Sequence, residues 1–278
     1  MNSLKDKVAF ITGTASKRGM GHTIALRLAG EGANVVVVDK YGAPRSLFPG
    51  DEEWGGLNAV VAEVESLGKE ALAVVADINN SKEVEAAVAK ALERFGKIDI
   101  LVHCAAIRGP VTTPIIDLAE GDWRRVLDVN LTGAFLISKV VAKSMVAKGK
   151  GGKIVLVASL GGVKGMPGSG GYCASKFGVL GLVKTLALEL ANYKINVNAI
   201  SPGTVITNLR DSFHIEKGQT EGITIDEAIR RDYQKLTEGI PLGRVGTTEE
   251  IANLALFLVS DQSNYITGEA INITGGVS

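Results

Sequence analysis

The sequence of 278 residues is poor in the side chains that disulfide frameworks and metal centres require. It contains only two cysteines, Cys104 and Cys173, and three histidines. The cysteines lie far apart and form no C-x-x-C pair, so we interpret them as reduced, buried thiols and expect no metal site. The chain also lacks a run of about 18 apolar residues and an apolar signal segment at its start, so we expect a cytoplasmic protein with no membrane partner.

A net charge is lacking as well, because 30 lysines and arginines balance 30 aspartates and glutamates. A balanced chain has no long-range field that would favour nucleic acid, so we expect small-molecule chemistry and no nucleic-acid partner. Apolar residues make up 46% of the sequence, enough for one large core, and we expect a single domain over residues 1–278. The 34 glycines exceed the average share of about 7% and indicate many tight turns.

Seven short apolar runs rich in β-branched residues alternate with longer amphipathic patterns, which predicts alternating strands and helices. Several of the runs are apolar on both faces, as in a parallel sheet with helices on both sides. The predicted fold is therefore α/β, a Rossmann-like doubly wound sheet. The seven runs span residues 7–13, 33–39, 70–77, 98–106, 151–159, 195–203 and 269–276.

Two segments interrupt this alternation. Residues 41–57 form an insertion rich in proline and glycine after the second run, and residues 207–244 form a long charged segment after the sixth. Ligands in doubly wound sheets bind beyond the carboxyl ends of the strands, so we expect residues 207–244 to act as a lid over the substrate. A surface decoration or a subunit contact is the alternative. We expect a helix near Ile225–Leu236 and a capping box between Thr247 and Glu250.

The stretch TGTASKRGMG, residues 12–21, follows the first predicted strand and opens a helix. Gly13, Gly19 and Gly21 allow a sharp turn and a close approach of the backbone to a pyrophosphate, and the helix start offers free N–H groups. An acidic residue, Asp39, ends the second run. This combination predicts a dinucleotide-binding site, although the turn is longer than the usual pattern.

Asp39 indicates which dinucleotide is bound. A carboxylate at this strand end can accept hydrogen bonds from both hydroxyls of the adenosine ribose and repels a 2′-phosphate, which favours NAD over NADP. Lys17, Arg18 and Lys40 argue the other way, because any of them could neutralise Asp39 or bind a phosphate. Asp77 ends the third run and is expected to reach the adenine edge.

The strongest catalytic pattern is downstream. Ser159 stands thirteen residues before Tyr172, and Lys176 follows Tyr172 by four, one turn along the expected helix. An ammonium beside a phenol favours the phenolate, so we expect Lys176 to lower the pKa of Tyr172 from about 10 and prepare it for proton transfer. Asn130 lies in a separate DVNLTG segment.

These features together resemble the short-chain dehydrogenase/reductase family over essentially the whole chain. The resemblance implies a catalytic tetrad of Asn130, Ser159, Tyr172 and Lys176. Tyr172 would be the general acid/base, Ser159 would polarise the substrate oxygen, Lys176 would bind the nicotinamide ribose, and Asn130 would position a water. The motifs that carry the resemblance are TGTASKRGMG, DVNLTG, Ser159, YCASK, SPGTVIT and ITGEAINITGG.

The predicted cofactor contacts combine the glycine turn, the ends of the second to fourth runs, the tetrad and the turn after the sixth run. Where the family commonly has NNAG, this chain reads HCAA, and we interpret His103 as a packed strand-end residue. The predicted contacts are Gly13, Ser16, Arg18, Gly19, Met20, Gly21, Asp39, Asp77, Ile78, Cys104, Ala105, Asn130, Tyr172, Lys176, Pro202, Gly203, Val205 and Thr207.

The predicted function is interconversion of a secondary alcohol and a ketone with NAD(H). The long glycine turn also resembles enoyl reductases of the same superfamily, but those enzymes space tyrosine and lysine more widely. Alternatives are an NADPH-dependent ketone or 3-oxoacyl reductase, a dehydratase or epimerase, and a non-catalytic nucleotide-sensing or scaffold protein. The resemblance further implies a homotetramer. Polar residues expected near the substrate, compatible with a sugar, polyol or hydroxy acid, are Arg108, Ser169, Asn208, Arg210 and His214.

Overall fold

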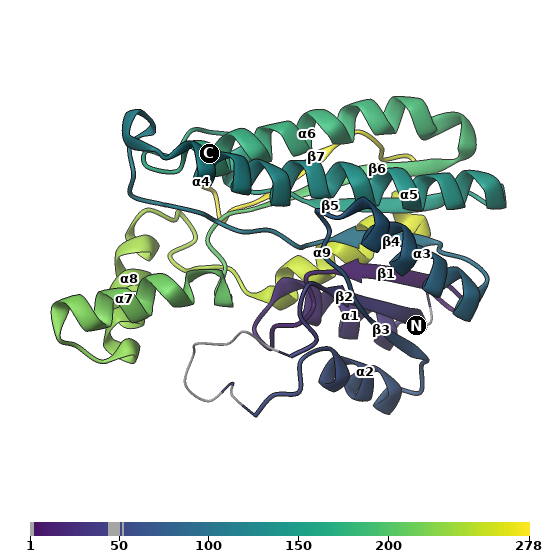
Figure 1. Ribbon diagram of the computed structural model, residues 1–278, viewed down its shortest axis with the longest axis horizontal. Helices are drawn as coiled ribbons and strands as arrows, with labels where there is room; N and C mark the ends of the chain where they lie inside the picture. Colours follow the sequence, from purple (N-terminus) through teal and green to yellow (C-terminus); the bar gives the residue numbers. More distant parts are fainter. Residues whose placement is uncertain (1–2, 44–50, 52) are drawn as a thin grey trace.

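The computed structural model describes residues 3–43, 51 and 53–278. Its centre is a seven-stranded parallel sheet in the order β3-β2-β1-β4-β5-β6-β7. All seven predicted runs form strands, which confirms the Rossmann-like doubly wound class (Figure 1). The strands are β1 (Val8–Thr12), β2 (Asn34–Asp39), β3 (Ala71–Val75), β4 (Ile100–His103), β5 (Gly152–Val157), β6 (Ile195–Pro202) and β7 (Ala270–Ile273).

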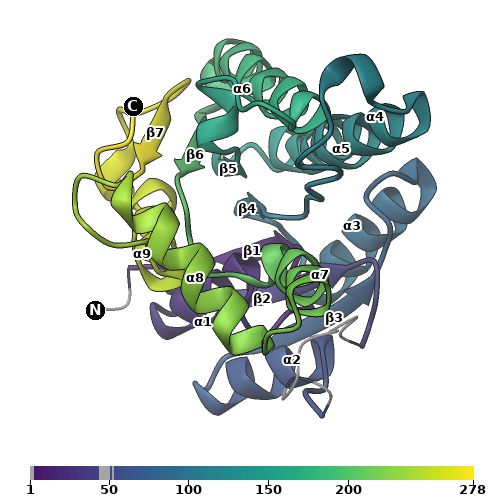
Figure 2. The ribbon, with the colours of Figure 1, turned by 90° about the vertical axis from the view of Figure 1, so that its left-hand side faces the viewer.

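Helices cover both faces of the sheet, with α1, α2 and α9 on one side and α3, α5 and α6 on the other (Figure 2). The helix α9 begins with the predicted capping box between Thr247 and Glu250. The helices are α1 (Met20–Gly30), α2 (Leu57–Ser66), α3 (Ser81–Phe95), α4 (Glu120–Leu127), α5 (Gly133–Lys148), α6 (Gly170–Leu190), α7 (Asp211–Glu221), α8 (Ile225–Glu238) and α9 (Thr248–Val259).

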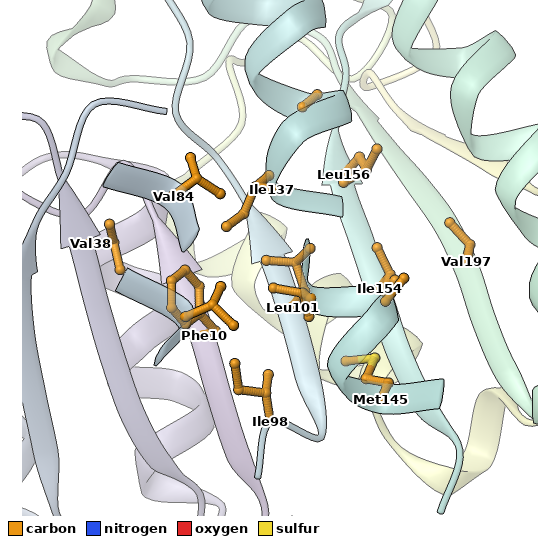
Figure 3. Close-up of a cluster of buried hydrophobic side chains, with 14 of the residues drawn as sticks. Phe10, Val38, Val84, Ile98, Leu101, Ile137, Met145, Ile154, Leu156 and Val197 are labelled. Atoms are coloured by element: carbon orange, nitrogen blue, oxygen red, sulfur yellow. The ribbon is translucent and has the colours of Figure 1, made fainter. Parts of the chain in front are cut away.

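The strands are apolar on both faces because each face has its own core. Phe10, Leu101 and Ile154 point into the cluster under α3, α5 and α6 (Figure 3). Their neighbours in sequence, such as Ile11 and Ile100, point into the cluster under α1, α2 and α9. Side chains alternate across a strand, so a sheet covered on both sides needs apolar residues at every position.

A five-residue π-helical turn, Asp128–Thr132, joins α4 to α5. The resulting helical stretch, Glu120–Lys148, is long and apolar enough by length and composition to cross a membrane. Its apolar residues Ala134, Ile137 and Val141 are buried in the core beneath α5, which accounts for the composition without a membrane. The turn matters more for function, because π-helical turns often occur at functional sites and this one contains Asn130.

The order of the strands determines where a ligand can bind. The chain proceeds from β1 outward to β2 and β3, and then returns to the other side of β1 with β4. Loops that leave the carboxyl ends of β1 and β4 therefore diverge and open a crevice between them. The helices α7 and α8 lie beyond this end of the sheet (Figure 2).

Candidate active site

A cavity of about 440 Å³ opens at the carboxyl ends of the strands. One end is lined by Asp39, the last residue of β2, and Asp77, which follows β3, and the other by Tyr172 and Lys176 of α6. The same cavity therefore joins the predicted adenosine end to the predicted catalytic end. The predicted cofactor contacts that line this cavity are Gly13, Ser16, Gly19, Met20, Gly21, Asp39, Asp77, Ile78, Cys104, Ala105, Tyr172, Lys176 and Thr207.

The glycine turn after β1 is built for close backbone contact. Gly13 has a φ of +74°, and a Cβ atom on it would lie 2.6 Å from the backbone nitrogen of Ala105. A Cβ on Gly21 would collide with the Gly13 carbonyl. The helix α1 then begins at Met20 with Gly19 as its N-cap, and no side chain caps its first N–H groups. These N–H groups and the dipole of α1 suit a pyrophosphate, so the residues present fit a dinucleotide.

Asp39 lies at the adenosine end with its carboxylate held in place. Its Oδ2 accepts a hydrogen bond of 2.9 Å from the backbone N–H of Ala15. Burial raises the pKa of Asp39, while backbone hydrogen bonds oppose this effect. Two of the three cations that we considered as partners for Asp39 bind elsewhere: Lys40 pairs with Asp77 at 2.6 Å, and Arg18 with Asp51 at 3.2 Å. Neither forms an ion pair with Asp39 among the described residues.

The bridge from Lys40 to Asp77 also changes the expected role of Asp77. Its carboxylate accepts from the ammonium of Lys40 and from the backbone N–H of Asn79, and these bonds outweigh burial and lower its pKa. Asp77 thus lines the cavity as half of an ion pair. Arg125 of α4 lines the same region, and sequence reasoning missed it because no local pattern brings α4 to the ends of β2 and β3.

Tyr172, Ser159 and Lys176 meet as predicted. Tyr172 and Lys176 are buried one turn apart on α6, and the half-buried Ser159 follows β5 with its hydroxyl close enough to the phenol to lower the pKa of Tyr172. The Ser159 Oγ also accepts from the backbone N–H of Gly161 at 3.1 Å. The Nζ of Lys176 donates to the Val157 carbonyl at 2.9 Å and lies 5.8 Å from the centroid of the Tyr172 ring.

The charge that acts on Tyr172 differs from our expectation. Burial raises the pKa of Tyr172, and the opposing influences are the hydroxyl of Ser159 and the positive charge of Arg108. The expectation that Lys176 lowers this pKa is therefore wrong for the structure as it stands. Burial lowers the pKa of Lys176 itself to about 8, and its ammonium is directed at the Val157 carbonyl.

Asn130 connects two parts of the site. Its Oδ1 accepts from the backbone N–H of Ile107 at 2.8 Å, and its Nδ2 donates to the Ile107 carbonyl at 2.9 Å. The same Nδ2 lies 3.0 Å from the Oγ of Ser175, which in turn donates to the Tyr172 carbonyl at 2.7 Å. Ser175 was missed, and its only sequence signal is its place three residues after Tyr172. The role of Asn130 toward a water stays a prediction.

The HCAA turn carries no reactive side chain. His103 is buried with its pKa lowered to about 3 by burial, and its Nδ1 lies 2.8 Å from the Oγ1 of Thr12. This confirms its interpretation as a packed strand-end residue. Burial raises the pKa of the Cys104 thiol to about 12, which makes the thiolate rare. Cys104 and Ala105 line the cavity and donate their backbone N–H groups to Thr12 Oγ1.

Several predicted residues lie outside the immediate lining of the cavity. Arg18 pairs with Asp51. In the turn Pro202–Val205, which precedes Thr207 in the chain, Val205 forms an isolated β-bridge with Gly246. Asn208 lines the cavity, whereas His214 is buried against Asp232 at 3.0 Å. The side chain of Arg210 and much of the predicted insertion, residues 44–50 and 52, lie outside the described residues. The predicted cofactor residues away from the lining are Arg18, Asn130, Pro202, Gly203 and Val205.

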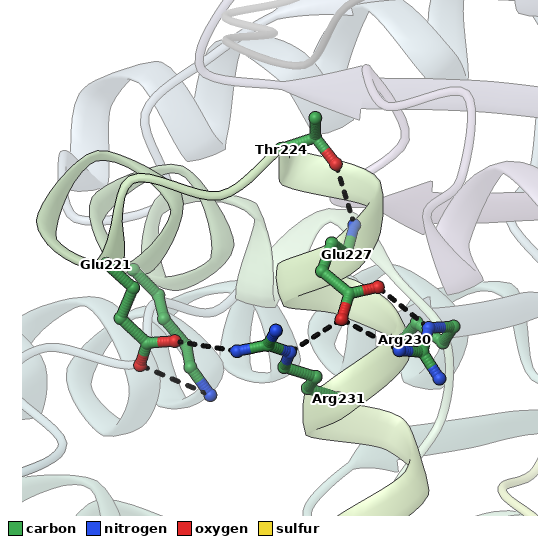
Figure 4. A network of polar contacts seen from close by, with 6 residues as sticks. Glu221, Thr224, Glu227, Arg230 and Arg231 are labelled. Atoms are coloured by element: carbon green, nitrogen blue, oxygen red, sulfur yellow. Dashed lines mark hydrogen bonds and ion pairs between the residues drawn. The ribbon is translucent and has the colours of Figure 1, made fainter.

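The 207–244 segment contains two helices, of which only α8 was predicted. Thr224 caps α8 by accepting from the Glu227 backbone N–H. Glu227 binds both Arg230 and Arg231, which hold its pKa down to about 2, and Arg231 reaches Glu221 of α7 at 3.6 Å (Figure 4). These ion pairs are exposed, so each contributes little to stability, but they tie α7 to α8.

A phosphate-type turn at the switch point of the sheet, and a buried tyrosine and lysine beside a serine at the far end of the same cavity, define a dinucleotide-dependent oxidoreductase. The family model described as enoyl-(acyl carrier protein) reductase matches residues 13–278. The chain belongs to the short-chain dehydrogenase/reductase family, whose members use NAD(P).

Individual relatives agree with this assignment. The chain is 36% identical to a 3-oxoacyl-[acyl-carrier-protein] reductase of Synechocystis, covering 100% of this chain and 99% of the relative. Among solved structures, levodione reductase has a TM-score of 0.85 at 33% identity, with 98% of each chain covered. Carveol dehydrogenase of Mycobacterium avium, in complex with NAD, has a TM-score of 0.86 at 30% identity over 100% of this chain and 99% of that chain.

Proposed function

We propose that the protein interconverts a secondary alcohol and a ketone with NAD(H). The observation that carries this proposal is the buried Tyr172 at one end of the dinucleotide-sized cavity, with the half-buried Ser159 hydroxyl close enough to oppose the effect of burial on the Tyr172 pKa. A substrate oxygen that binds both hydroxyls would be polarised by Ser159 and lie within proton-transfer distance of Tyr172.

Each residue then has one task. In the oxidative direction, Tyr172 as phenolate takes the hydroxyl proton of the alcohol, and in the reductive direction it returns that proton to the ketone oxygen. When bound, the nicotinamide supplies the hydride acceptor, so that the alcohol loses two electrons and NAD⁺ becomes NADH. Lys176 would hold the nicotinamide ribose and exchange its bond with Val157 for that contact.

The preference for NAD rests on Asp39, whose carboxylate is fixed by Ala15 and paired with neither Lys40 nor Arg18. A fixed negative charge at this position repels a 2′-phosphate. The relative named 3-oxoacyl-[acyl-carrier-protein] reductase supports the alternative of an NADPH-dependent ketone or 3-oxoacyl reductase. Lys17 and Arg125, which line the same end of the cavity, are the residues that this alternative would use.

The experiment is to screen polyols, sugars, hydroxy acids and 3-oxoacyl thioesters for cofactor absorbance at 340 nm, with NAD(H) and NADP(H) side by side. We expect turnover with NAD(H), and a loss of about 10²–10⁴-fold in the Tyr172→Phe variant because general acid/base catalysis is removed. Near-normal turnover of this variant would sink the mechanism. Cofactor binding without any turnover would support a nucleotide sensor, and product without net cofactor change would support a dehydratase or epimerase.

We also propose a homotetramer in the cytoplasm, built on α5 and α6. Phe135 of α5 and Phe177 and Leu188 of α6 are large apolar side chains that the single chain leaves exposed. Burying such residues against a second copy would remove a large apolar surface from water. Light scattering of the purified protein tests this, and a monomer at micromolar concentration would contradict it.

A further inference from the structure

The loop after β4 places a second cation beside the candidate general acid/base. The Cζ of Arg108 lies 5.8 Å from the centroid of the Tyr172 ring, the same distance as the Nζ of Lys176. Arg108 comes from the loop after β4 and Lys176 from α6, so two cations from different elements lie near one phenol. Arginine keeps its charge at every physiological pH, whereas burial lowers the pKa of Lys176 to about 8.

The backbone that carries Arg108 is fixed on both sides. Asn130 holds the preceding residue, Ile107, through both its N–H and its carbonyl, at 2.8 and 2.9 Å. The following residue, Gly109, has a φ of +67°, and a Cβ on it would collide with the side chain of Val126. The backbone position of Arg108 is therefore set by contacts of its two neighbours. Arg108 itself is half-buried.

Arg108 is not itself among the lining residues of the cavity, but its contacts place it beside the tyrosine end and not the adenosine end. Ile107, its neighbour, and Tyr172, its ring partner, both line the cavity, while Asp39 and Lys40 line the opposite end. A substrate oxygen at Tyr172 would bring the atoms bonded to its carbon close to the guanidinium. A planar cation with five N–H donors there matches a carboxylate, with which it can form two parallel hydrogen bonds.

We propose that Arg108 is a specificity-determining residue that selects substrates with a carboxylate next to, or one carbon away from, the reacting carbinol carbon. The inference rests on the proposed alcohol–ketone chemistry and narrows it to hydroxy acids and their keto acids. The guanidinium binds the carboxylate while Ser159 and Tyr172 bind the reacting oxygen. Two anchors fix the carbon between them, which orients it for hydride transfer.

Arg108 also affects proton transfer. The groups that act on the Tyr172 hydroxyl are Ser159 after β5, Arg108 after β4 and the Cys173 thiol of α6, with Lys176 on the next turn of α6. The positive charge of Arg108 opposes the effect of burial and favours the phenolate. Removal of that charge should move the pH range over which the oxidation rate rises to higher pH, a change that a residue with only a packing role would not cause.

The test compares Arg108→Met, Arg108→Lys and the matched surface control Arg124→Met, whose arginine is exposed on α4 and pairs with Glu120. Each variant is assayed with 2- and 3-hydroxy acids and with the corresponding uncharged amides. We expect wild type to prefer acids over amides by at least about tenfold in kcat/KM. Arg108→Met should lose this preference because its KM for the acids rises. Arg108→Lys should restore part of it, and Arg124→Met should match wild type.

A binding measurement keeps the inference testable without turnover. Oxamate, an anion, and oxamide, its uncharged analogue, are titrated into the protein with NADH bound, using NADH fluorescence in wild type, Tyr172→Phe and Arg108→Met. We expect oxamate to bind at least about tenfold more tightly than oxamide in the first two proteins, with the difference lost in Arg108→Met. Equal binding of oxamate and oxamide to wild type, or an unchanged difference in Arg108→Met, would overturn the inference. Oxamate selectivity in a protein that turns over no alcohol would contradict the proposed function and leave an anion site at Arg108.

Discussion

The amide nitrogen of Asn130 lies 3.0 Å from the hydroxyl oxygen of Ser175. This contact joins the π-helical turn before α5 to the helix that carries Tyr172 and Lys176. Through its other bonds, Asn130 also holds the loop of Ile107. One buried side chain thus aligns three segments that are distant in sequence, and its removal should affect both stability and catalysis.

Asn130→Ala should lower the free energy of unfolding by about 1–3 kcal/mol, because it removes a buried amide and leaves the half-buried N–H and carbonyl of Ile107 without their protein partner. Urea unfolding of wild type and variant measures this change. Asn264→Ala serves as the control, since its amide is exposed and makes only a marginal bond of 3.5 Å to Asp261. An Asn130→Ala protein as stable as the control variant would show that these bonds are replaced by water at little cost.

Asp39→Ser should shift the cofactor preference toward NADP, because it removes the fixed carboxylate that faces the ribose end of the cavity. We expect the ratio of kcat/KM for NADP over NAD to rise at least about tenfold. Arg18→Ala should change this ratio little, since Arg18 is directed to Asp51. A large fall in NADP use in Arg18→Ala would instead assign Arg18 to the phosphate.

Lys176 should make the stability of the ligand-free protein depend on pH. Burial lowers its pKa in the folded state to about 8 from 10.5, so the folded protein binds fewer protons than the unfolded chain between these values. Stability contributed by this site therefore increases as the pH rises from about 8 toward 10.5, by an amount on the order of 3 kcal/mol. Lys176→Met should flatten this part of the curve in urea unfolding at pH 7.5–10, and an unchanged slope would contradict the prediction.

Asp232→Ala should loosen α7 from α8, because it removes the buried partner of His214. The first residues of the 207–244 segment, Thr207 and Asn208, line the cavity, so a loosened segment should raise the KM for substrate by about tenfold with little change in cofactor binding. Hydrogen exchange over residues 211–238 measures the loosening directly. Asp226→Ala, at an exposed position on α8, is the control.

The sheet could be predicted from the sequence because its strands are buried on both faces and read as continuous apolar runs between glycines and acids. The glycine turn and the Ser159–Tyr172–Lys176 group were also accessible, since their spacing is local. The helix α7 was missed: its sequence DSFHIEKGQTE is polar, contains a glycine and shows no apolar face. It is held instead by α8, through contacts such as that of His214 with Asp232.

The electrostatics of the site could not be predicted in the same way. The sequence places Lys176 next to Tyr172 on a helix, but its ammonium is directed at the Val157 carbonyl on β5, and Arg108 supplies the charge that acts on the phenol. Likewise, Lys40 follows Asp39 in sequence yet pairs with Asp77, which lies just after the neighbouring strand β3. In both cases the deciding partner comes from a different strand end, which only the folded sheet brings near.

The contact between Gly13 and the backbone of Ala105 has a consequence for how this site tolerates variation. The ends of β1 and β4 touch through main-chain atoms, and Cys104 and Ala105 are anchored there by their N–H groups to Thr12. The wall of the cavity between β1 and β4 is thus made of peptide groups, and their position depends on the absence of a side chain at residue 13. The side chains of Cys104 and Ala105 take no part in this contact and can vary, whereas any residue larger than glycine at position 13 would force the two strands apart.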